Sequence, residues 1–184
     1  MKISELQRHV GTEPDGLWGM KSAAACQAYL RSLMPQDNPW PKSDPDSLTR
    51  FFGKPGNEAN LVNLDVKGLG LCYEGAKLRT IRCHEKVGDS LHRILTVISK
   101  GPDAELLKKY AGCYNYRVMR GGTSLSCHAW GIAIDLAPDT NGNRMPWPKI
   151  ATMPITVMEA FSREGFLSAG SAWSRDAMHF QATQ

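Results

Sequence analysis

The sequence has no long apolar run and no cysteine framework. Within its 184 residues, no window approaches the roughly 18 apolar residues of a membrane span. Met1-Lys2-Ile3 leads into a polar segment and not into the apolar core of a signal peptide. The five cysteines are odd in number and irregularly spaced, which indicates free thiols in a chain made in a reducing cytoplasm. We therefore expect no signal peptide and no membrane insertion.

Basic residues also form no run and no helical stripe, although the net charge is +4. Residues 1–47 contain five Lys or Arg and six Asp or Glu, a net charge of −1, whereas residues 48–184 contain 17 and 12, a net charge of +5. A mildly basic region is attracted to an anionic polymer such as a bacterial cell wall. Because no nucleic-acid-binding motif accompanies the charge, we expect no nucleic-acid partner.

Two segments that lie far apart contain the side chains best suited to a metal site. SCHAWGIAIDL contains His128 and Asp135, and DAMHF contains His179. Two imidazoles and one carboxylate are the three protein ligands of a catalytic zinc site, whose fourth position holds a water with a pKa of roughly 7. A separate carboxylate must move the proton of that water. Asp176 is the acidic residue nearest to His179, so it is the candidate general base.

The local pattern places these residues on strands. Apolar residues alternate over Ile132–Leu136, which predicts a strand with one buried face and Asp135 on the other. An Asp inside an apolar strand is costly unless it is paired or bound to a cation. Met178–Gln181 predicts a second strand that presents its histidine to the same metal. Asp176 lies an odd number of residues before that histidine, so we expect a turn between residues 173 and 177 to bring it back.

The motif Ser-x-His-x-x-Gly-x-Ala-x-Asp-Leu, followed by Asp-x-Met-His-Phe, resembles the zinc D-alanyl-D-alanine carboxypeptidase family. That family includes phage endolysins that cut the L-alanyl-D-glutamate bond of peptidoglycan stem peptides. The resemblance implies that one Zn²⁺ is held by His128, Asp135 and His179. It also implies that Asp176 occupies the position of the catalytic Glu or Asp, as a shorter variant where many members have Glu.

The same resemblance implies an Arg and a Ser upstream of the first ligand that hold the substrate. Arg117 is the preferred match, with Arg120 as the alternative, because a guanidinium binds a carboxylate through two parallel hydrogen bonds. Ser126 is the matching serine. From the residues alone, either arginine could be a solvated strand residue, and Ser126 could be a turn residue after the Gly121-Gly122 loop.

The N-terminus carries a second resemblance. Leu6-Gln7 and Asp15-Gly16-Leu17-Trp18-Gly19, followed by an Ala-rich stretch, are similar to the small helical peptidoglycan-binding domain found beside many wall hydrolases. Residues 1–34 would form this domain, with Trp18 as an apolar anchor; the alternative is a helical hairpin packed on the catalytic domain. Residues 35–47 contain four prolines and predict a linker. The catalytic domain would then span residues 48–184.

The remaining pattern predicts an α+β domain in which a small antiparallel sheet carries the site on one face and helices flank it. Apolar residues at helical spacing predict a helix over Glu85–Lys100. Further helices are expected from Pro102 and over Pro154–Phe166, the latter with Met158, Phe161 and Phe166 on its inner side. A third strand is expected over Tyr116–Met119. The pattern over residues 51–71 predicts no particular secondary structure.

Three classes of function fit these residues. The first is a zinc peptidase acting on peptidoglycan, as an L-alanyl-D-glutamate endopeptidase or as a D-alanyl-D-alanine carboxypeptidase. The second is a non-haem iron oxygenase, which also uses two His and one carboxylate but usually has one residue between its first His and the acid. The third is a non-catalytic zinc module such as the related hedgehog signalling domain, which would not need Asp176. Cys127 is not an expected ligand. His84 is interpreted as a structural residue at the start of a helix, with a place near the site as the alternative.

The first class is the prediction, and an endopeptidase is favoured because a wall-binding module raises the effective concentration on the polymer. The resemblance to phage lysins implies synthesis in the host cytoplasm, and we expect a monomer. It would reach the wall with the help of a separate membrane-permeabilising protein.

Overall fold

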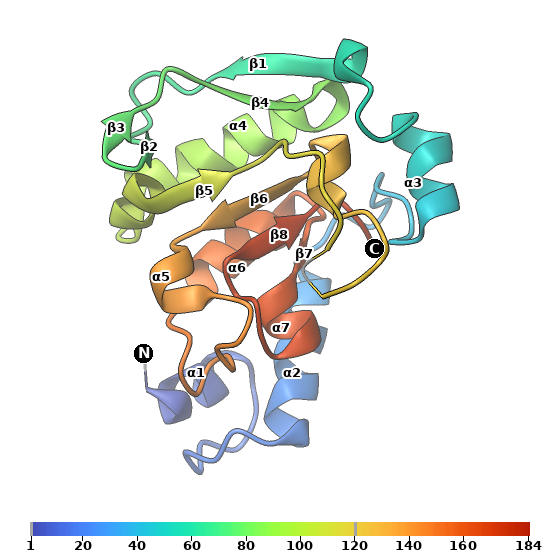
Figure 1. The fold of residues 1–184 in the computed structure, drawn as a ribbon. Coiled ribbons are helices and arrows are strands. Elements are labelled where there is room, and N and C mark those ends of the chain that lie inside the picture. The colour runs from blue at the N-terminus through green and yellow to red at the C-terminus, as the bar shows by residue number, and fades with distance from the viewer. Residues whose placement is uncertain (1, 120) are drawn as a thin grey trace.

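The computed structural model describes residues 2–119 and 121–184, and its helices surround short strands (Figure 1). The α-helices are α1 (Ile3–His9), α2 (Met20–Ser32), α3 (Pro45–Phe52), α4 (Glu85–Lys100), α5 (Pro138–Asn141), α6 (Ile155–Arg163) and α7 (Ala169–Trp173). The 3-10 helices are η1 (Glu58–Asn60), η2 (Ala104–Lys109) and η3 (Cys127–Trp130). The strands are β1 (Leu61–Asp65), β2 (Cys72–Tyr73), β3 (Ala76–Lys77), β4 (Thr80–His84), β5 (Tyr110–Gly112), β6 (Ala133–Leu136), β7 (Leu167–Ser168) and β8 (His179–Gln181).

The central sheet has the strand order β5-β6-β8-β7, and every pairing in it is antiparallel. Separate two-stranded pairs join β1 with β4 and β2 with β3. Every residue of β6 and β8 is buried, because both faces of these inner strands are covered. The expected mixture of helices with small antiparallel sheets is therefore confirmed.

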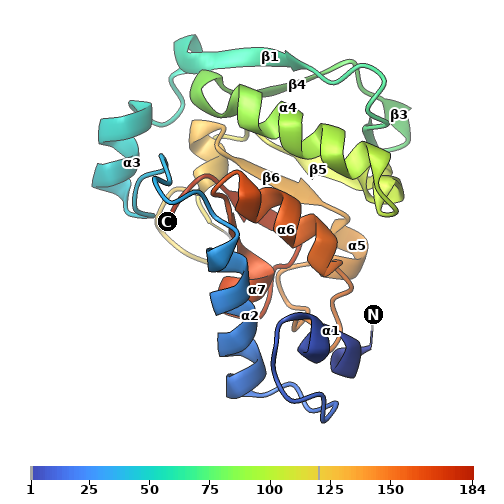
Figure 2. The ribbon, with the colours of Figure 1, turned by 180° about the vertical axis from the view of Figure 1, so that it is seen from behind.

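The two longest predicted helices are confirmed and cover one face of this sheet (Figure 2). Helix α4 spans the predicted Glu85–Lys100 and buries its apolar stripe. Helix α6 begins after Pro154, and Met158 and Phe161 on its inner side are completely buried. The ring of Phe161 stacks on Phe180 of β8 with 3.8 Å between ring centroids, so α6 is fixed directly to the strand that carries His179.

Two of the three expected strands are confirmed, as β6 and β8. The strand expected over Tyr116–Met119 is wrong, because only an isolated bridge joins Val118 to Leu125 there. The sheet is extended instead by β5, which ends at a bulge where Gly112 adopts φ 121°. Beyond this bulge the chain leaves the sheet, and Tyr116, Val118 and Met119 are about half exposed.

Smaller elements also differ from expectation. The helix expected from Pro102 is the six-residue 3-10 helix η2. The unassigned residues 51–71 contain the end of α3, η1 and β1. Among the described residues, none of the helices is both long and apolar enough to cross a membrane.

The N-terminal helices pack on the rest of the protein. Trp18 is 9 % exposed and meets Trp147 edge to face, with 5.5 Å between ring centroids. Tyr29 of α2 donates a hydrogen bond to Glu159 of α6 at 2.9 Å, and Gln27 donates to the carbonyl of Ser171 at 3.0 Å. The buried residues of 1–34 and 48–184 belong to one hydrophobic core, so the described chain shows no separate all-α domain.

The proline-rich segment is fixed to the surface of the same core. Trp40 is 5 % exposed, and its Nε1 donates to the carbonyl of Glu164 at 2.8 Å. Asn38 donates to the carbonyl of Gly165 at 2.9 Å. Helix α3 already begins at Pro45, capped by Asp44, so the expected boundary between residues 47 and 48 falls inside a helix.

Candidate metal centre and active site

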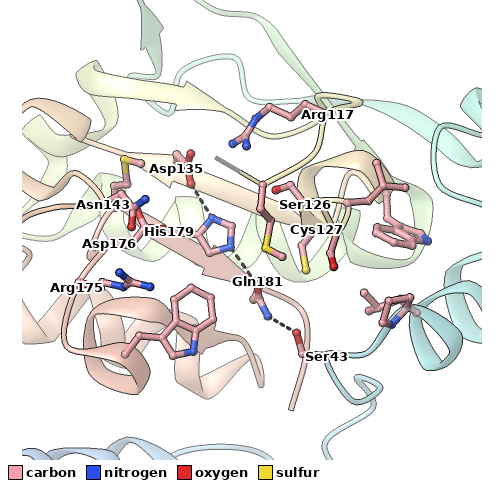
Figure 3. A pocket seen from close by; sticks show the side chains of 18 residues that line it. Ser43, Arg117, Ser126, Cys127, Asp135, Asn143, Arg175, Asp176, His179 and Gln181 are labelled. Atoms are coloured by element: carbon pink, nitrogen blue, oxygen red, sulfur yellow. Dashed lines mark hydrogen bonds and ion pairs between the residues drawn. The ribbon is translucent and has the colours of Figure 1, made fainter. Parts of the chain in front are cut away.

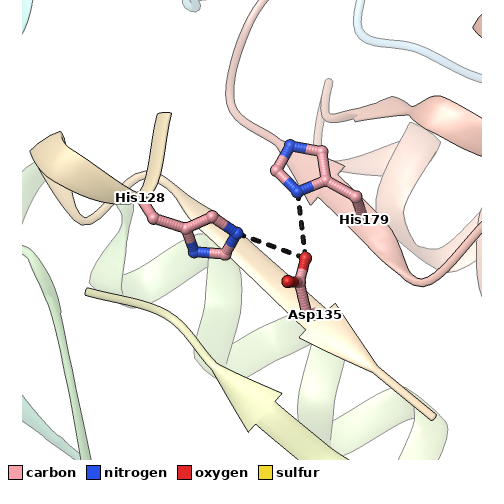
Figure 4. A group of neighbouring side chains, drawn as sticks. All are labelled: His128, Asp135 and His179. Carbon is pink, nitrogen blue, oxygen red and sulfur yellow. Dashed lines mark hydrogen bonds and ion pairs between the residues drawn. The ribbon is translucent and has the colours of Figure 1, made fainter. Parts of the chain in front are cut away.

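Three buried side chains from three elements meet on the face of the sheet opposite α4 and α6 (Figure 4). His128 lies on η3, Asp135 on β6 and His179 on β8. Asp135 and His179 are direct partners in the antiparallel register. The candidate ligand atoms of the three residues all lie within 4.8 Å of one another. The structure thus brings together the three residues that the sequence predicts as ligands.

His128 directs an unpaired nitrogen toward Asp135. Its Nδ1 lies 2.6 Å from the carbonyl oxygen of Cys113, and a carbonyl can only accept, so Nδ1 is the donor. In the neutral ring, Nε2 then carries the lone pair. Nε2 is buried without a hydrogen-bond partner in the described structure and lies 3.2 Å from Asp135 Oδ1.

His179 has the complementary arrangement. Its Nε2 lies 3.0 Å from Gln181 Oε1 and its Nδ1 lies 2.9 Å from Asp135 Oδ1. Gln181 is held through its amide nitrogen by Ser43 at 2.9 Å and Thr183 at 2.7 Å. Because Gln181 Oε1 accepts from Nε2, the lone pair of the neutral ring lies on Nδ1 and faces Asp135.

The electrostatics of the group suit a cation. Burial raises the pKa of Asp135, but the neighbouring His128 and His179, which attract the carboxylate when they are protonated, lower that pKa well below its usual range. Asp135 is therefore a carboxylate. Two imidazole lone pairs and one carboxylate oxygen that converge without a donor repel one another unless a proton or a metal ion lies between them. Two nitrogens and one oxygen match the three-ligand zinc sites of hydrolases, so the residues fit Zn²⁺.

A cavity of about 430 Å³ opens over this centre (Figure 3). Asp135, His179 and Asp176 all line it. The expected turn is confirmed: α7 ends at Trp173, and Ser174 and Asp176 adopt φ values of 56° and 57°. The backbone N–H of His179 donates to the carbonyl of Asp176 at 2.9 Å, which closes the turn.

Asp176 has the properties of a carboxylate that exchanges protons. Its Oδ1 is buried and has no hydrogen-bond partner among the described residues. Burial raises the pKa of Asp176 above its ordinary value, because the charged form is poorly solvated there. A carboxyl group with a raised pKa is better matched to taking and returning a proton near neutral pH.

The predicted substrate-binding residues differ in how their side chains are held. Arg117 lines the cavity, and its described hydrogen bond is a 3.4 Å contact with the carbonyl of Val118, so its guanidinium is available to a ligand. Ser126 also lines the cavity, but it is 5 % exposed and its Oγ accepts a 3.4 Å bond from the N–H of His128. Ser126 therefore caps η3 as a turn residue would. Arg120, the alternative to Arg117, lies outside the described residues.

Several cavity residues were not expected from the sequence. Arg175 directly precedes Asp176 in the sequence, and this position next to the candidate general base was a usable signal that Arg175 lies at the site. Gln181 shares a strand face with His179, which was a usable signal for a residue that orients the imidazole. Trp173 stacks on His179 with 6.0 Å between ring centroids. Asn143 also lines the cavity, and nothing in the sequence pattern indicates it.

His84 and Cys127 have other roles. His84 caps α4: its Nδ1 accepts from the N–H of Lys86 at 3.1 Å, and its Nε2 donates to the carbonyl of Phe52 at 2.8 Å. Cys127 lines the cavity but lies outside the His128, Asp135 and His179 group. Burial raises the pKa of the Cys127 thiol to about 12, so it is not an available thiolate.

Two His, one Asp and an acid without a partner in the described structure are the groups that a zinc hydrolase uses. Comparison with known families then gives a match to the family described as D-alanyl-D-alanine carboxypeptidase, over residues 120–182. The matched segment contains His128, Asp135, Asp176 and His179, whereas Arg117 lies just before it. No curated protein and no solved structure matches the chain. The family match and the buried His/Asp/His group together identify the chain as a zinc metallopeptidase.

Proposed function

We propose that the protein is a peptidoglycan hydrolase that cuts stem-peptide amide bonds, with L-alanyl-D-glutamate as the bond. The observation that carries the catalytic part is the buried, unpartnered Asp176 Oδ1 in the cavity beside the His/Asp/His group. A structural zinc site has no need of such an acid. The peptidoglycan part is supported by the description of the matched family.

His128, Asp135 and His179 would hold the zinc ion. Zinc with three protein ligands supplies a Lewis acid that makes a water molecule acidic near neutral pH. The carbonyl of Cys113 and the amide of Gln181 keep both imidazoles in the tautomer that leaves a lone pair for the metal. The buried sheet register fixes the positions of Asp135 and His179.

Asp176 would act as the general base and then as the general acid. Its carboxylate accepts the proton of the attacking water and returns it to the leaving amine. The raised pKa of Asp176 favours the second of these transfers, because a weaker acid holds its proton until the amine departs. Arg117 would bind a substrate carboxylate, and Ser126 would shape the cavity wall next to His128.

The N-terminal residues 1–34 would bind the cell wall, although they share a core with the rest of the chain. A monomeric endolysin made in a phage-infected host cytoplasm fits this reading. The proposal includes peptidoglycan as the partner and neither nucleic acid nor a membrane. The net charge of +5 over residues 48–184 would favour an anionic wall.

The second candidate is a D-alanyl-D-alanine carboxypeptidase, which the description of the matched family favours. Mass spectrometry of purified peptidoglycan after digestion separates the two. An endopeptidase creates a new D-Glu amino terminus, whereas a carboxypeptidase releases free D-Ala. Digestion that yields D-Ala and no new D-Glu terminus would replace the first proposal with the second.

A non-haem iron oxygenase and a non-catalytic zinc module are the remaining classes. The oxygenase is disfavoured because six residues separate His128 from Asp135 and because it would not use Asp176. Wall lysis by the zinc-loaded protein that survives replacement of Asp176 would remove the proposed mechanism. Zinc-loaded wild-type protein that releases no D-Ala and creates no new D-Glu terminus from peptidoglycan would favour the non-catalytic module.

A further inference from the structure

A second cavity also borders the metal centre. Its volume is about 240 Å³, and His128 and Asp135 form part of its wall. It shares Asp135 and Arg117 with the larger cavity. Both cavities therefore border the metal centre, and a ligand longer than one cavity could extend from it into the other.

A glycine at the bulge of β5 lines this second cavity. Gly112 is the register partner of Asp135 and adopts φ 121°, a conformation that side chains rarely tolerate. A Cβ at this position would meet no heavy atom within 4 Å. The space above Gly112 is thus empty, and Asp135 can be reached from the β5 side of the sheet.

Aromatic rings form the far wall of this second cavity. Tyr73 and Tyr110 meet edge to face with 6.4 Å between ring centroids, and Tyr73 is 45 % exposed. The guanidinium of Arg82 lies 5.6 Å from the ring centroid of Tyr114. Asp135 is the sole acidic residue in the described wall. Such a wall offers ring faces and hydrogen-bond donors to an uncharged, ring-shaped group.

The larger cavity differs in that neither of its arginines has an acidic partner in the described structure. In the second cavity, by contrast, Arg82 is paired with Glu58, and Arg117 lines both cavities. Arg117 and Arg175 line it from different sides (Figure 3), and neither forms an ion pair within the described structure. Two free guanidinium groups suit a ligand segment that carries carboxylates. A peptidoglycan stem has both parts: a sugar ring at one end and acidic residues at the other.

We propose that the cavity walled by Tyr73, Tyr110 and Tyr114 is a subsite for the sugar ring to which the stem peptide is attached. This inference rests on the proposed peptidoglycan substrate. The acidic part of the stem then lies in the larger cavity, and the bond to be cut lies between them at the metal centre. A carboxypeptidase, which removes a single terminal residue, would need room for a long ligand segment on one side of the bond only.

The test compares two substrates of identical peptide sequence. One is a disaccharide tetrapeptide from peptidoglycan, and the other is the same tetrapeptide with an acetyl group in place of the sugars. Zinc-loaded wild-type protein should cut the sugar-bearing substrate with a kcat/KM roughly 3- to 10-fold higher, the range expected of one aromatic contact. Tyr73→Ala should abolish this preference, and Tyr73→Phe, which keeps the ring, should restore it.

Tyr116→Ala is the matched control, because Tyr116 is 59 % exposed and lines neither cavity. It should keep the wild-type preference. A Tyr73→Ala protein with the wild-type ratio of the two kcat/KM values would overturn the subsite. If wild-type protein cuts neither substrate, the proposed function fails, and NMR titration with the free disaccharide decides the subsite alone. Binding that is lost in Tyr73→Ala supports it, and no binding to wild-type protein overturns it.

Discussion

Asp135 and His179 face each other across the antiparallel pair β6 and β8, with 2.9 Å between Asp135 Oδ1 and His179 Nδ1. The sheet register therefore sets the geometry of two of the three candidate ligands. A slip of one residue would turn His179 to the opposite face of the sheet, where α6 packs against Phe180. The core that fixes the register also fixes the metal centre.

Replacement of Asp176 by Ala should abolish catalysis and leave metal binding intact. Asp176 belongs to the turn before β8 and not to the His/Asp/His group. Loss of a general acid and base typically lowers kcat by roughly 10²- to 10⁴-fold. Turnover of a soluble stem peptide and zinc content by elemental analysis are the measurements. The control is Asp139→Ala, which should keep full activity. Asp139 is an exposed acid on α5 that forms an ion pair with Lys109.

Replacement of Gln181 by Leu should weaken zinc binding. The variant leaves Nε2 of His179 without its acceptor, so the ring no longer has a fixed tautomer or orientation. Residues that hold a metal-binding imidazole typically affect affinity by about 10- to 100-fold. Competition with a zinc chelator measures the change. Gln184→Leu is the matched control, since its amide donates to the carbonyl of Asn38 at 2.9 Å; equal zinc affinity in both variants would contradict the role of Gln181.

The sequence predicts the metal centre well because each of its signals is local. Alternation over residues 132–136 identifies the strand of Asp135, and helical spacing predicts α4 with its correct bounds. The odd separation of Asp176 from His179 is enough to require the turn that the structure shows. Each of these patterns is a spacing between residues that are near one another in the sequence, so it can be read without knowing which distant segments pack together.

Other features could not be read from the sequence because tertiary contacts decide them. Residues 116–119 alternate like a strand, yet the bulge at Gly112 directs them away from the sheet. The four prolines of the expected linker indicate stiffness, but they do not show that Trp40 fills a place beside Phe52 and Phe166. Trp40 of the expected linker therefore belongs to the hydrophobic core.

His84 should make stability depend on pH. Burial lowers the pKa of His84 below its ordinary value of 6.5. Below pH 6.5, His84 is therefore protonated more readily in the unfolded chain than in the folded protein. The contribution of His84 to stability is therefore complete above pH 6.5 and decreases as the pH falls toward the folded-state pKa. Urea unfolding at several pH values measures this slope.

His84→Asn removes the titrating group and keeps a residue that caps helices well. The difference in unfolding free energy between wild-type protein and this variant should shrink as the pH falls below 6.5. His92→Asn is the control, because His92 lies on the exposed side of α4. A difference that stays constant with pH in the His84 variant would show that His84 does not titrate as described.

Replacement of Trp18 by Ala should test whether residues 1–34 unfold together with the rest. Trp18 is 9 % exposed and contacts Trp147, and truncation of a buried Trp typically costs about 3–5 kcal/mol. Because both tryptophans belong to one core, the whole unfolding transition should move to lower temperature in a calorimetric scan. Met20→Ala is the control, since Met20 is 91 % exposed and its loss should leave the transition in place. A new early transition with an unchanged main one would show instead that the N-terminal helices fold as a separate unit that docks on the peptidase.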